Sequence, residues 1–225
     1  MTLGPGEPPL QVFLIAGEAS GDRLGAALMR GLRAELIDAG PEGVGGAAFH
    51  GVGGAAMAAE GLQSLFPISE IAVMGLAEVL PRLPTILKRI RETTEAVIAS
   101  RPDVVVTIDA PDFGLRVSRR AGAALGDATT FVHYVAPSVW AWRPKRAEKM
   151  ARSTDHLLAL LPFEPPYFHR VGLSCDFVGH PIVEASAGVD PDDRSIRAEI
   201  GVAPDAPLII ALPGSRRGEV ERLAP

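Results

Sequence analysis

The stretch that decides the fold spans residues 104–113 and reads Val-Val-Val-Thr-Ile-Asp-Ala-Pro-Asp-Phe. Its first five residues are all β-branched, and Pro102 and Pro111 bound the run. A short apolar run of this kind predicts a strand buried on both faces, as in the middle of a parallel sheet. The strand ends at the carboxylate of Asp109. Because open parallel α/β sheets bind ligands at the carboxyl ends of their strands, Asp109 is a candidate for chemistry.

Composition narrows the classes of function. The chain has 225 residues, 47% of them hydrophobic, and a formal net charge of −5. It has no basic block, which argues against nucleic acid as the main ligand, since phosphate contacts need clustered Lys and Arg. The single cysteine, Cys175, leaves no internal disulfide or cysteine-based zinc site and is interpreted as a buried, inert thiol. The five histidines form no helical i, i+4 pair, so we expect no metal.

We expect neither a membrane span nor a leader in this sequence. No stretch reaches the roughly 18 apolar residues that a spanning helix needs. Residues 1–11 are rich in Pro and Gly and lack the basic-then-apolar pattern of a signal peptide. We therefore expect a cytoplasmic protein that begins with a flexible tail.

A first strand at residues 12–16 leads into a glycine-rich turn at 17–22 and a helix at 23–36. The glycines are spaced by four, which is not the dinucleotide-binding fingerprint (Gly17, Gly21, Gly25). Ser20 or Asp22 would serve as the N-cap of the helix. Glu18 is not needed for capping, which makes it a candidate for ligand binding.

The same reasoning extends along the chain. Further strands are predicted at 47–52, 129–135, 156–160 and 177–179, and helices at 53–60, 113–124 and 162–170. Asp112 is the expected N-cap of the helix at 113–124. Residues 73–100 are mostly helical in pattern, and Pro81 and Pro84 should kink or split that helix.

Two segments allow two interpretations each. Apolar residues at 76–87 alternate with Arg82 and Lys88, as in core packing or in a face that lies on an anionic membrane. Trp140 and Trp142 precede a basic helix start at 143–146. They are either core anchors beside a solvated helix face, or a wall for a sugar or acyl chain with cations for phosphate.

A composition change marks the end of the first domain. Residues 12–184 form one α/β domain, 185–206 a linker, and 207–225 the start of a second domain, with a strand at 207–212. The turn that follows carries Ser215 and Arg216, and a helix N-terminus beside an arginine suits a diphosphate. One strand and half a helix cannot bury a core. We expect the chain to be truncated, or these residues to dock on the first domain.

These motifs resemble the N-terminal part of the lipid-A-disaccharide synthase family of GT-B glycosyltransferases. The resemblance rests on Ala-Gly-Glu-Ala-Ser-Gly-Asp at 16–22, Ile-Asp-Ala-Pro-Asp-Phe at 108–113, and matching segments at 72–80, 133–142, 161–164, 179–181 and 212–220. Each is weak alone, but their order along residues 12–220 is specific. The resemblance implies a Rossmann-like domain with a parallel sheet flanked by helices, plus the first βα unit of a truncated nucleotide-sugar-binding domain.

The resemblance also implies a reaction. UDP-2,3-diacylglucosamine donates its sugar to lipid X (2,3-diacylglucosamine 1-phosphate), with inversion and loss of UDP. The family's essential aspartate falls on Asp109, the expected base, and its arginine on Arg216. Substrate contacts are expected from the remaining candidates: Glu18, Ser20, Trp140, Arg143 and Ser215. No cofactor or metal is implied.

The family's membrane-facing segment falls on Val79, Leu80, Leu83, Ile86 and Leu87. The resemblance therefore implies a protein peripheral on the inner membrane, and it leaves a homo-oligomer open. Two alternatives remain: a UDP-N-acetylglucosamine 2-epimerase-like enzyme, and a non-catalytic acceptor-binding domain. We expect the 225 residues alone to be inactive.

Overall fold

The computed structural model describes residues 8–38, 46–72, 76–183, 193–203, 205–213, 220–221 and 223. The chain divides into two compact units, residues 1–183 and 184–225. None of the helices in the described ranges combines the length and apolarity that crossing a bilayer requires.

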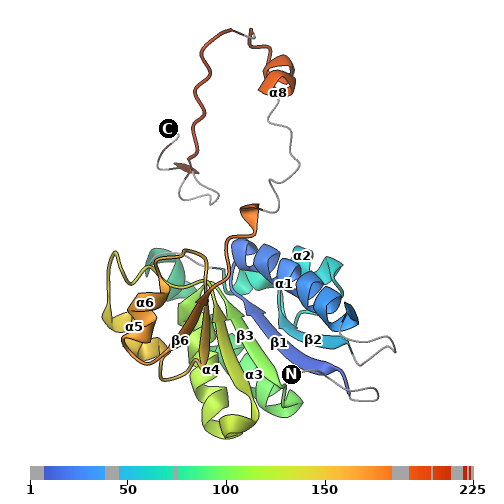
Figure 1. Cartoon of the computed structure of the whole chain (residues 1–225), viewed down its shortest axis with the longest axis vertical. Helices are drawn as coiled ribbons and strands as arrows, with labels where there is room; N and C mark the ends of the chain where they lie inside the picture. Colours follow the sequence, from blue (N-terminus) through green and yellow to red (C-terminus); the bar gives the residue numbers. More distant parts are fainter. Residues whose placement is uncertain are drawn as a thin grey trace. The chain divides into compact units, whose positions relative to one another are not determined.

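The first unit is built on a six-stranded parallel sheet (Figure 1). Its strands are β1 (Leu10–Ala16), β2 (Ala47–Val52), β3 (Val104–Ile108), β4 (Thr130–Tyr134), β5 (His156–Ala159) and β6 (Ser174–Phe177). The spatial order is β2-β1-β3-β4-β5-β6, and every neighbouring pair is parallel. The predicted central strand is confirmed, because β3 lies between β1 and β4.

Helices cover the sheet on both faces. They are α1 (Ala19–Asp38), α2 (Ala55–Ala59), α3 (Leu76–Ser100), α4 (Pro111–Leu125), α5 (Lys145–Met150) and α6 (Pro165–His169). Figure 1 shows α1 and α2 together beside β1 and β2, and α5 and α6 near β6. The α/β class, with a parallel sheet flanked by helices, is confirmed.

Side-chain alternation along the strands explains the two layers. Leu14 and Ile108 belong to the core beneath α1 and α2, whereas Phe13 and Val105 belong to the core beneath α3 and α4. Burial of one such side chain contributes about 1.5–3 kcal/mol. The single cysteine lies in a third cluster, between the sheet and α5 and α6. Burial raises the pKa of the Cys175 thiol to about 12, which confirms its interpretation as an inert core residue.

Some predicted boundaries were wrong. The last strand of the first unit is β6 at 174–177 rather than 177–179. The helix α3 is not split, although Pro81 and Pro84 lie inside it. Both prolines are exposed, so water can hydrogen-bond a carbonyl that lacks its helical donor.

Asp112 is not the N-cap of α4. The helix begins at Pro111, and the N-cap residue is Ala110 in a left-handed conformation, with no side-chain cap. Asp112 lies one residue inside the helix, where its exposed carboxylate forms an ion pair with Arg146 at 3.1 Å.

The second unit contains helix α8 (Asp193–Glu199). The predicted strand at 207–212 is not formed, since residues 205–213 have no helix or strand. Ile209 and Leu212 in this segment are 91% and 88% exposed. A strand needs a neighbour for its backbone hydrogen bonds, and none of the described residues of this unit forms one.

Asp22 stabilises a helix other than its own. Helix α1 already begins at Ala19, so Asp22 lies in its first turn. Its carboxylate accepts hydrogen bonds from three backbone N–H groups at the start of α2: Gly54 at 2.7 Å, Ala56 at 2.9 Å and Met57 at 3.0 Å. These are the donors that a helix N-terminus leaves without intrahelical partners. The residue that looked like a local cap is therefore a tertiary cap.

We predict that Asp22→Ala lowers the free energy of unfolding by about 2 kcal/mol, because three buried or half-buried donors lose their acceptor. The measurement is urea unfolding followed by circular dichroism. Asp112→Ala is the matched control, since its ion pair is exposed and should contribute at most about 0.5 kcal/mol. Equal effects of the two substitutions would contradict the cap.

Candidate functional site

Ser20 and Asp109 meet at the carboxyl edge of the sheet, where β1 and β3 lie side by side. The Ser20 hydroxyl donates a hydrogen bond to Oδ2 of Asp109 at 3.0 Å, and both residues are half-buried. The strand order reverses direction between these two strands, because β2 lies on one side of β1 and all later strands lie on the other. Open α/β sheets form their ligand crevice at this switch point.

The backbone after β3 fixes the direction of the carboxylate. Asp109 and Ala110 have φ angles of +52° and +37°, a region that non-glycine residues seldom adopt. The Asp109 N–H donates to the Tyr134 carbonyl at 2.9 Å, so the turn stays attached to β4. Oδ1 of Asp109 accepts the Ala110 N–H at 2.9 Å. Both carboxylate oxygens therefore have a donor, and the half-exposed group remains accessible.

Glycines bring the two turns together. A Cβ on Gly17 would lie 2.3 Å from the Ala110 Cβ, and one on Gly21 would lie 3.1 Å from the Ile108 carbonyl oxygen. A Cβ on Gly25 would meet the Met57 sulfur at 2.6 Å. The three glycines spaced by four therefore lie on one face of the turn and of α1. Gly17 and Gly21 pack against the end of β3 and the turn after it, and Gly25 of α1 packs against Met57 of α2. This packing brings Ser20 within hydrogen-bonding distance of Asp109.

A buried histidine lies beneath the site and was missed by the sequence analysis. His133 on β4 is fully buried, and its Nδ1 is 2.6 Å from the Thr107 hydroxyl oxygen on β3. Within the described residues its Nε2 has no hydrogen-bond partner. Burial lowers the pKa of His133 from 6.5 to about 4, although the Asp109 carboxylate opposes this shift. The Arg146 guanidinium adds a smaller lowering. His133 is therefore neutral at physiological pH.

The loop after β4 carries the two tryptophans at the surface. Trp140 and Trp142 are 44% and 56% exposed, so they are not core anchors. The Trp140 ring meets Phe163 edge-on at 5.2 Å, and the Arg143 guanidinium lies 4.4 Å from the centre of the Trp142 ring. The described contacts of Trp140 and Arg143 are made within this region rather than with Ser20 or Asp109.

The candidates on α3 divide by exposure. Leu80, Leu83 and Leu87 are 66%, 39% and 43% exposed, at spacings that place them on one face of the helix. Ile86 is half-buried and packs against the core beneath α3 and α4. The side chain of Val79 lies outside the described residues.

The remaining candidates are placed unevenly. Glu18 is half-buried on the β1–α1 turn, at the same edge of the sheet as Asp109. Ser215 and Arg216 lie outside the described residues. The structure therefore joins two of the predicted site residues directly, Ser20 and Asp109, and carries a third on the same turn as Ser20.

This geometry suits proton abstraction. Asp109 is an accessible carboxylate held by a rigid strand end, and a neighbouring hydroxyl orients it. A group with these properties can remove a proton from an acceptor hydroxyl that comes within about 3 Å.

Comparison with known families decides the relationship. Residues 12–225 match the family described as lipid-A-disaccharide synthetase. The chain belongs to this family. The resemblance drawn from the motifs is thereby confirmed, and the members of the family are lipid-A-disaccharide synthases, glycosyltransferases of lipid A biosynthesis.

Two curated members of the lipid-A-disaccharide synthase family show how far the match extends. The chain is 57% identical over 216 residues to the enzyme of Ruegeria pomeroyi, a match that covers 96% of this chain and 51% of that protein. It is 57% identical over 220 residues to the enzyme of Rhodospirillum centenum, covering 96% and 52%. The chain spans about half the length of these relatives.

Solved structures are more distant. A UDP-GlcNAc 2-epimerase from Neisseria meningitidis bound to UDP-GlcNAc aligns at 10% identity with a TM-score of 0.49, covering 86% of this chain and 54% of that one. A Glycyrrhiza uralensis protein complexed with glycyrrhetinic acid 3-O-monoglucuronide aligns at 13% identity with a TM-score of 0.47, covering 87% and 53%. Both scores are below 0.5, so the fold assignment rests on the sheet topology.

The lowered pKa of His133 predicts a pH effect on stability. The unfolded chain binds a proton at this residue below about pH 6.5, whereas the folded chain binds it only below about pH 4. The contribution of neutral His133 to the free energy of unfolding is complete above about pH 6.5. About 3 kcal/mol of this free energy is lost as the pH falls from about 6.5 to about 4.

His133→Gln lacks this titration and keeps a polar group beside Thr107. We expect the unfolding free energy of the wild-type chain minus that of this variant to decrease as the pH falls from about 7 to about 4, because only the wild-type chain contains His133. Urea unfolding at intervals across this range measures the difference. Carboxylates titrate alike in both proteins and cancel, so parallel pH curves would show that His133 does not titrate as described.

Proposed function

We propose that the protein of which these residues form about half is an inverting hexosyltransferase. It transfers the sugar of UDP-2,3-diacylglucosamine to lipid X and so makes the disaccharide 1-phosphate of lipid A. The observation that supports this most directly is the Ser20–Asp109 hydrogen bond at the switch point of the sheet, in a chain of the lipid-A-disaccharide synthase family.

In the proposed step, Asp109 acts as the general base. An acceptor hydroxyl oxygen attacks the anomeric carbon of the donor as its proton passes to the Asp109 carboxylate. The bond from that carbon to the UDP oxygen breaks on the opposite face, and the electron pair leaves with UDP. One bond forms as one breaks, so the anomeric centre inverts. UDP is a good leaving group and needs charge stabilisation more than a proton.

Further roles follow from position. Ser20 orients the carboxylate, so we assign it to positioning, while Glu18 on the same turn would contact the acceptor sugar. Ser215 and Arg216 would stabilise the departing diphosphate through backbone N–H groups and a guanidinium. Trp140 and Arg143 would contact an acyl chain and a phosphate of a substrate that is still embedded in the bilayer. None of these steps requires a metal or a cofactor.

The exposed leucines of α3 support a peripheral membrane location on the cytoplasmic side of the inner membrane, where acylated substrates reside. Leu80, Leu83 and Leu87 present apolar surface to solvent, and the exposed cations Arg82 and Lys88 lie beside them. An apolar face with a basic fringe binds the interface of an anionic bilayer. The enzyme would thereby meet both lipid substrates without extracting them.

We predict that Asp109→Asn lowers the rate of UDP release from the two acylated sugars by about a hundredfold or more, because the base is lost. The assay uses a chain of the relatives' full length. Ser20→Ala should cost about tenfold, since one charge-assisted hydrogen bond is removed.

Asp112→Asn is the matched control for this assay. It removes a carboxylate three residues further on, whose partner is Arg146, and should leave turnover within about twofold of the wild type. Near-normal turnover of Asp109→Asn would remove Asp109 as the base.

We predict that Leu80→Ser/Leu83→Ser/Leu87→Ser lowers binding to anionic vesicles at least about tenfold, because apolar surface is lost from the interface. The free energy of unfolding should change by at most about 0.5 kcal/mol per substitution, as for exposed sites. Ile90→Ser, at a buried position one turn further on, should cost about 3 kcal/mol or more. A triple variant as unstable as Ile90→Ser would mean that the three leucines belong to the core.

A further inference from the structure

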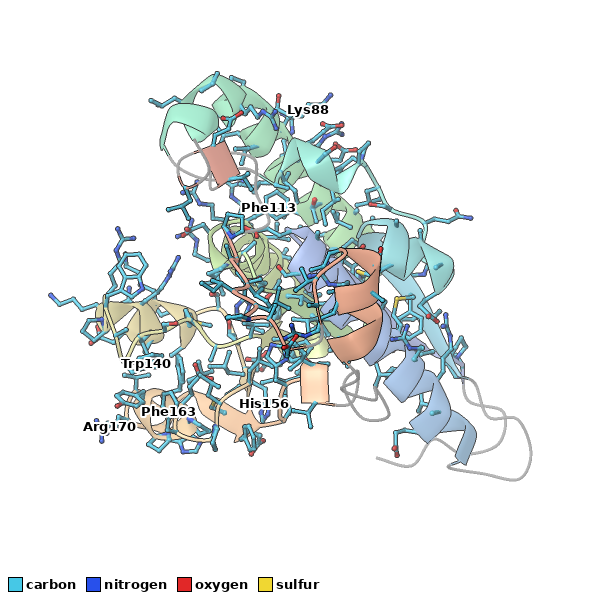
Figure 2. The ribbon with its side chains drawn as sticks, turned by 90° about the horizontal axis from the view of Figure 1, so that it is seen from above. Lys88, Phe113, Trp140, His156, Phe163 and Arg170 are labelled. Carbon is cyan, nitrogen blue, oxygen red and sulfur yellow. The ribbon has the colours of Figure 1, made fainter. Side chains whose placement is uncertain are left out.

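A second exposed apolar surface lies on the first unit, away from α3. We call it the aromatic–basic patch, and its members are Trp140, Trp142, Arg143, Phe163, Tyr167 and Arg170. Phe163 is 47% exposed, and both tryptophans are similarly open. Figure 2 shows Trp140, Phe163 and Arg170 in one region of the unit, with Lys88 of α3 in another.

The exposed rings of the patch contact neighbouring side chains. Trp140 packs edge-on against Phe163, and its indole N–H donates to Oε1 of Glu164 at 3.4 Å. Glu164 is buried and also accepts the Leu161 N–H at 3.0 Å, which anchors the turn after β5. The Arg170 guanidinium lies 5.5 Å from the centre of the Tyr167 ring. The hydrogen bond to the buried Glu164 orients the Trp140 ring, and arginines lie against the rings of Trp142 and Tyr167.

The backbone beneath the patch supports the same interpretation. Val135 and Arg143, at the two ends of the β4–α5 loop, have φ angles of +84° and +53°. A positive φ is costly for a β-branched residue such as Val135. Strain of this kind persists where the surrounding structure enforces it, and it clusters at functional surfaces.

The patch is locally basic in an acidic chain. Segments 138–149 and 161–170 contain five cations and two carboxylates, one of which is the buried Glu164, whereas the whole chain has a net charge of −5. One of these cations, Arg146, is paired with Asp112 of α4, which leaves four. Exposed Trp and Tyr rings with cations around them match the interface of an anionic bilayer, where the rings lie at headgroup depth.

The topology places this surface at the same edge of the sheet as Asp109. The patch lies on the segments that follow β4 and β5, and Asp109 follows β3, so all three come from the carboxyl ends of parallel strands. Helix α3 ends before β3 and runs antiparallel to it, so its leucines lie toward this edge too. Asp109 follows β3, which lies between β2 and β5 in the strand order. Helix α3 contacts β2, and the patch lies beside β5, so Asp109 lies between the two surfaces.

We propose that the aromatic–basic patch is a second membrane-docking surface that binds an anionic bilayer, so that the unit contacts the membrane on both sides of Asp109. This inference extends the proposed function and fixes which edge of the domain faces the lipid. Its main test measures binding to vesicles that contain no substrate, so its failure is distinguishable from failure of the proposed reaction.

The chain supplies its own probe, because its two tryptophans both lie in the patch. The experiment records the tryptophan emission of the 225-residue chain with phosphatidylcholine vesicles and with mixed phosphatidylcholine–phosphatidylglycerol vesicles, each with and without brominated acyl chains. We expect a blue shift and bromine quenching with the anionic vesicles only. Bound protein whose emission neither shifts nor is quenched would overturn the proposal.

Charge variants test the same surface by co-sedimentation. Arg143→Gln/Arg170→Gln should lower partitioning onto the anionic vesicles about fivefold for each cation removed. Arg119→Gln/Arg120→Gln on α4 removes the same charge outside the patch and should have a smaller effect. Equal losses in the two variants would overturn the proposal in favour of nonspecific attraction.

Two further arms separate the patch from other occupants. In Leu80→Ser/Leu83→Ser/Leu87→Ser, quenching should persist at raised lipid concentration, and its loss at every concentration would show that the patch has no affinity of its own. Emission that changes with a detergent-dispersed acylated glucosamine phosphate but not with vesicles would make the patch a substrate site and overturn bilayer docking.

Discussion

The contact between the β1–α1 turn and the β3–α4 turn is the constraint on which the site depends. At Gly17 there is no room for a Cβ, because the Ala110 side chain occupies that space. Gly21 lies almost as close to the end of β3. Gly17 in particular lets the two turns approach closely enough for the Ser20 hydroxyl to reach Asp109. The hydrogen bond is thus a consequence of backbone packing between two neighbouring parallel strands.

The same contact maintains an unfavourable backbone. Asp109 and Ala110 are consecutive non-glycine residues with positive φ, which costs about 1–2 kcal/mol for each. The hydrogen bond from the Asp109 N–H to Tyr134 and the start of α4 hold this turn in place. This strained turn holds a carboxylate at the end of β3, one of the two central strands. Strained residues of this kind are concentrated at functional sites.

Family membership indicates the class of enzyme, and the geometry indicates which residues would act in it. The family match extends over nearly the whole chain and identifies the class of enzyme, while the relatives are about twice as long. The geometry of the first unit assigns tasks within that class: a proposed base, a residue that orients it, and two exposed apolar surfaces near the same edge. Together they support the proposal of a domain that binds the acceptor at a lipid surface.

The sequence was sufficient to predict features that depend on neighbouring residues alone. The β-branched run at 104–108 specified a buried central strand, and the glycine spacing specified a close-packed turn and helix. The position of Asp109 at a strand end made it the candidate base. Pairings across the fold could not be predicted in this way. Asp22 caps a helix more than thirty residues away in the sequence. The N-cap residue of α4 is Ala110 and not the predicted Asp112. His133 became notable only when its partner on β3 and its burial were known. Sequence periodicity reports which side chains are buried, whereas hydrogen-bond partners, pKa shifts and exposed rings depend on which segments the tertiary structure brings together.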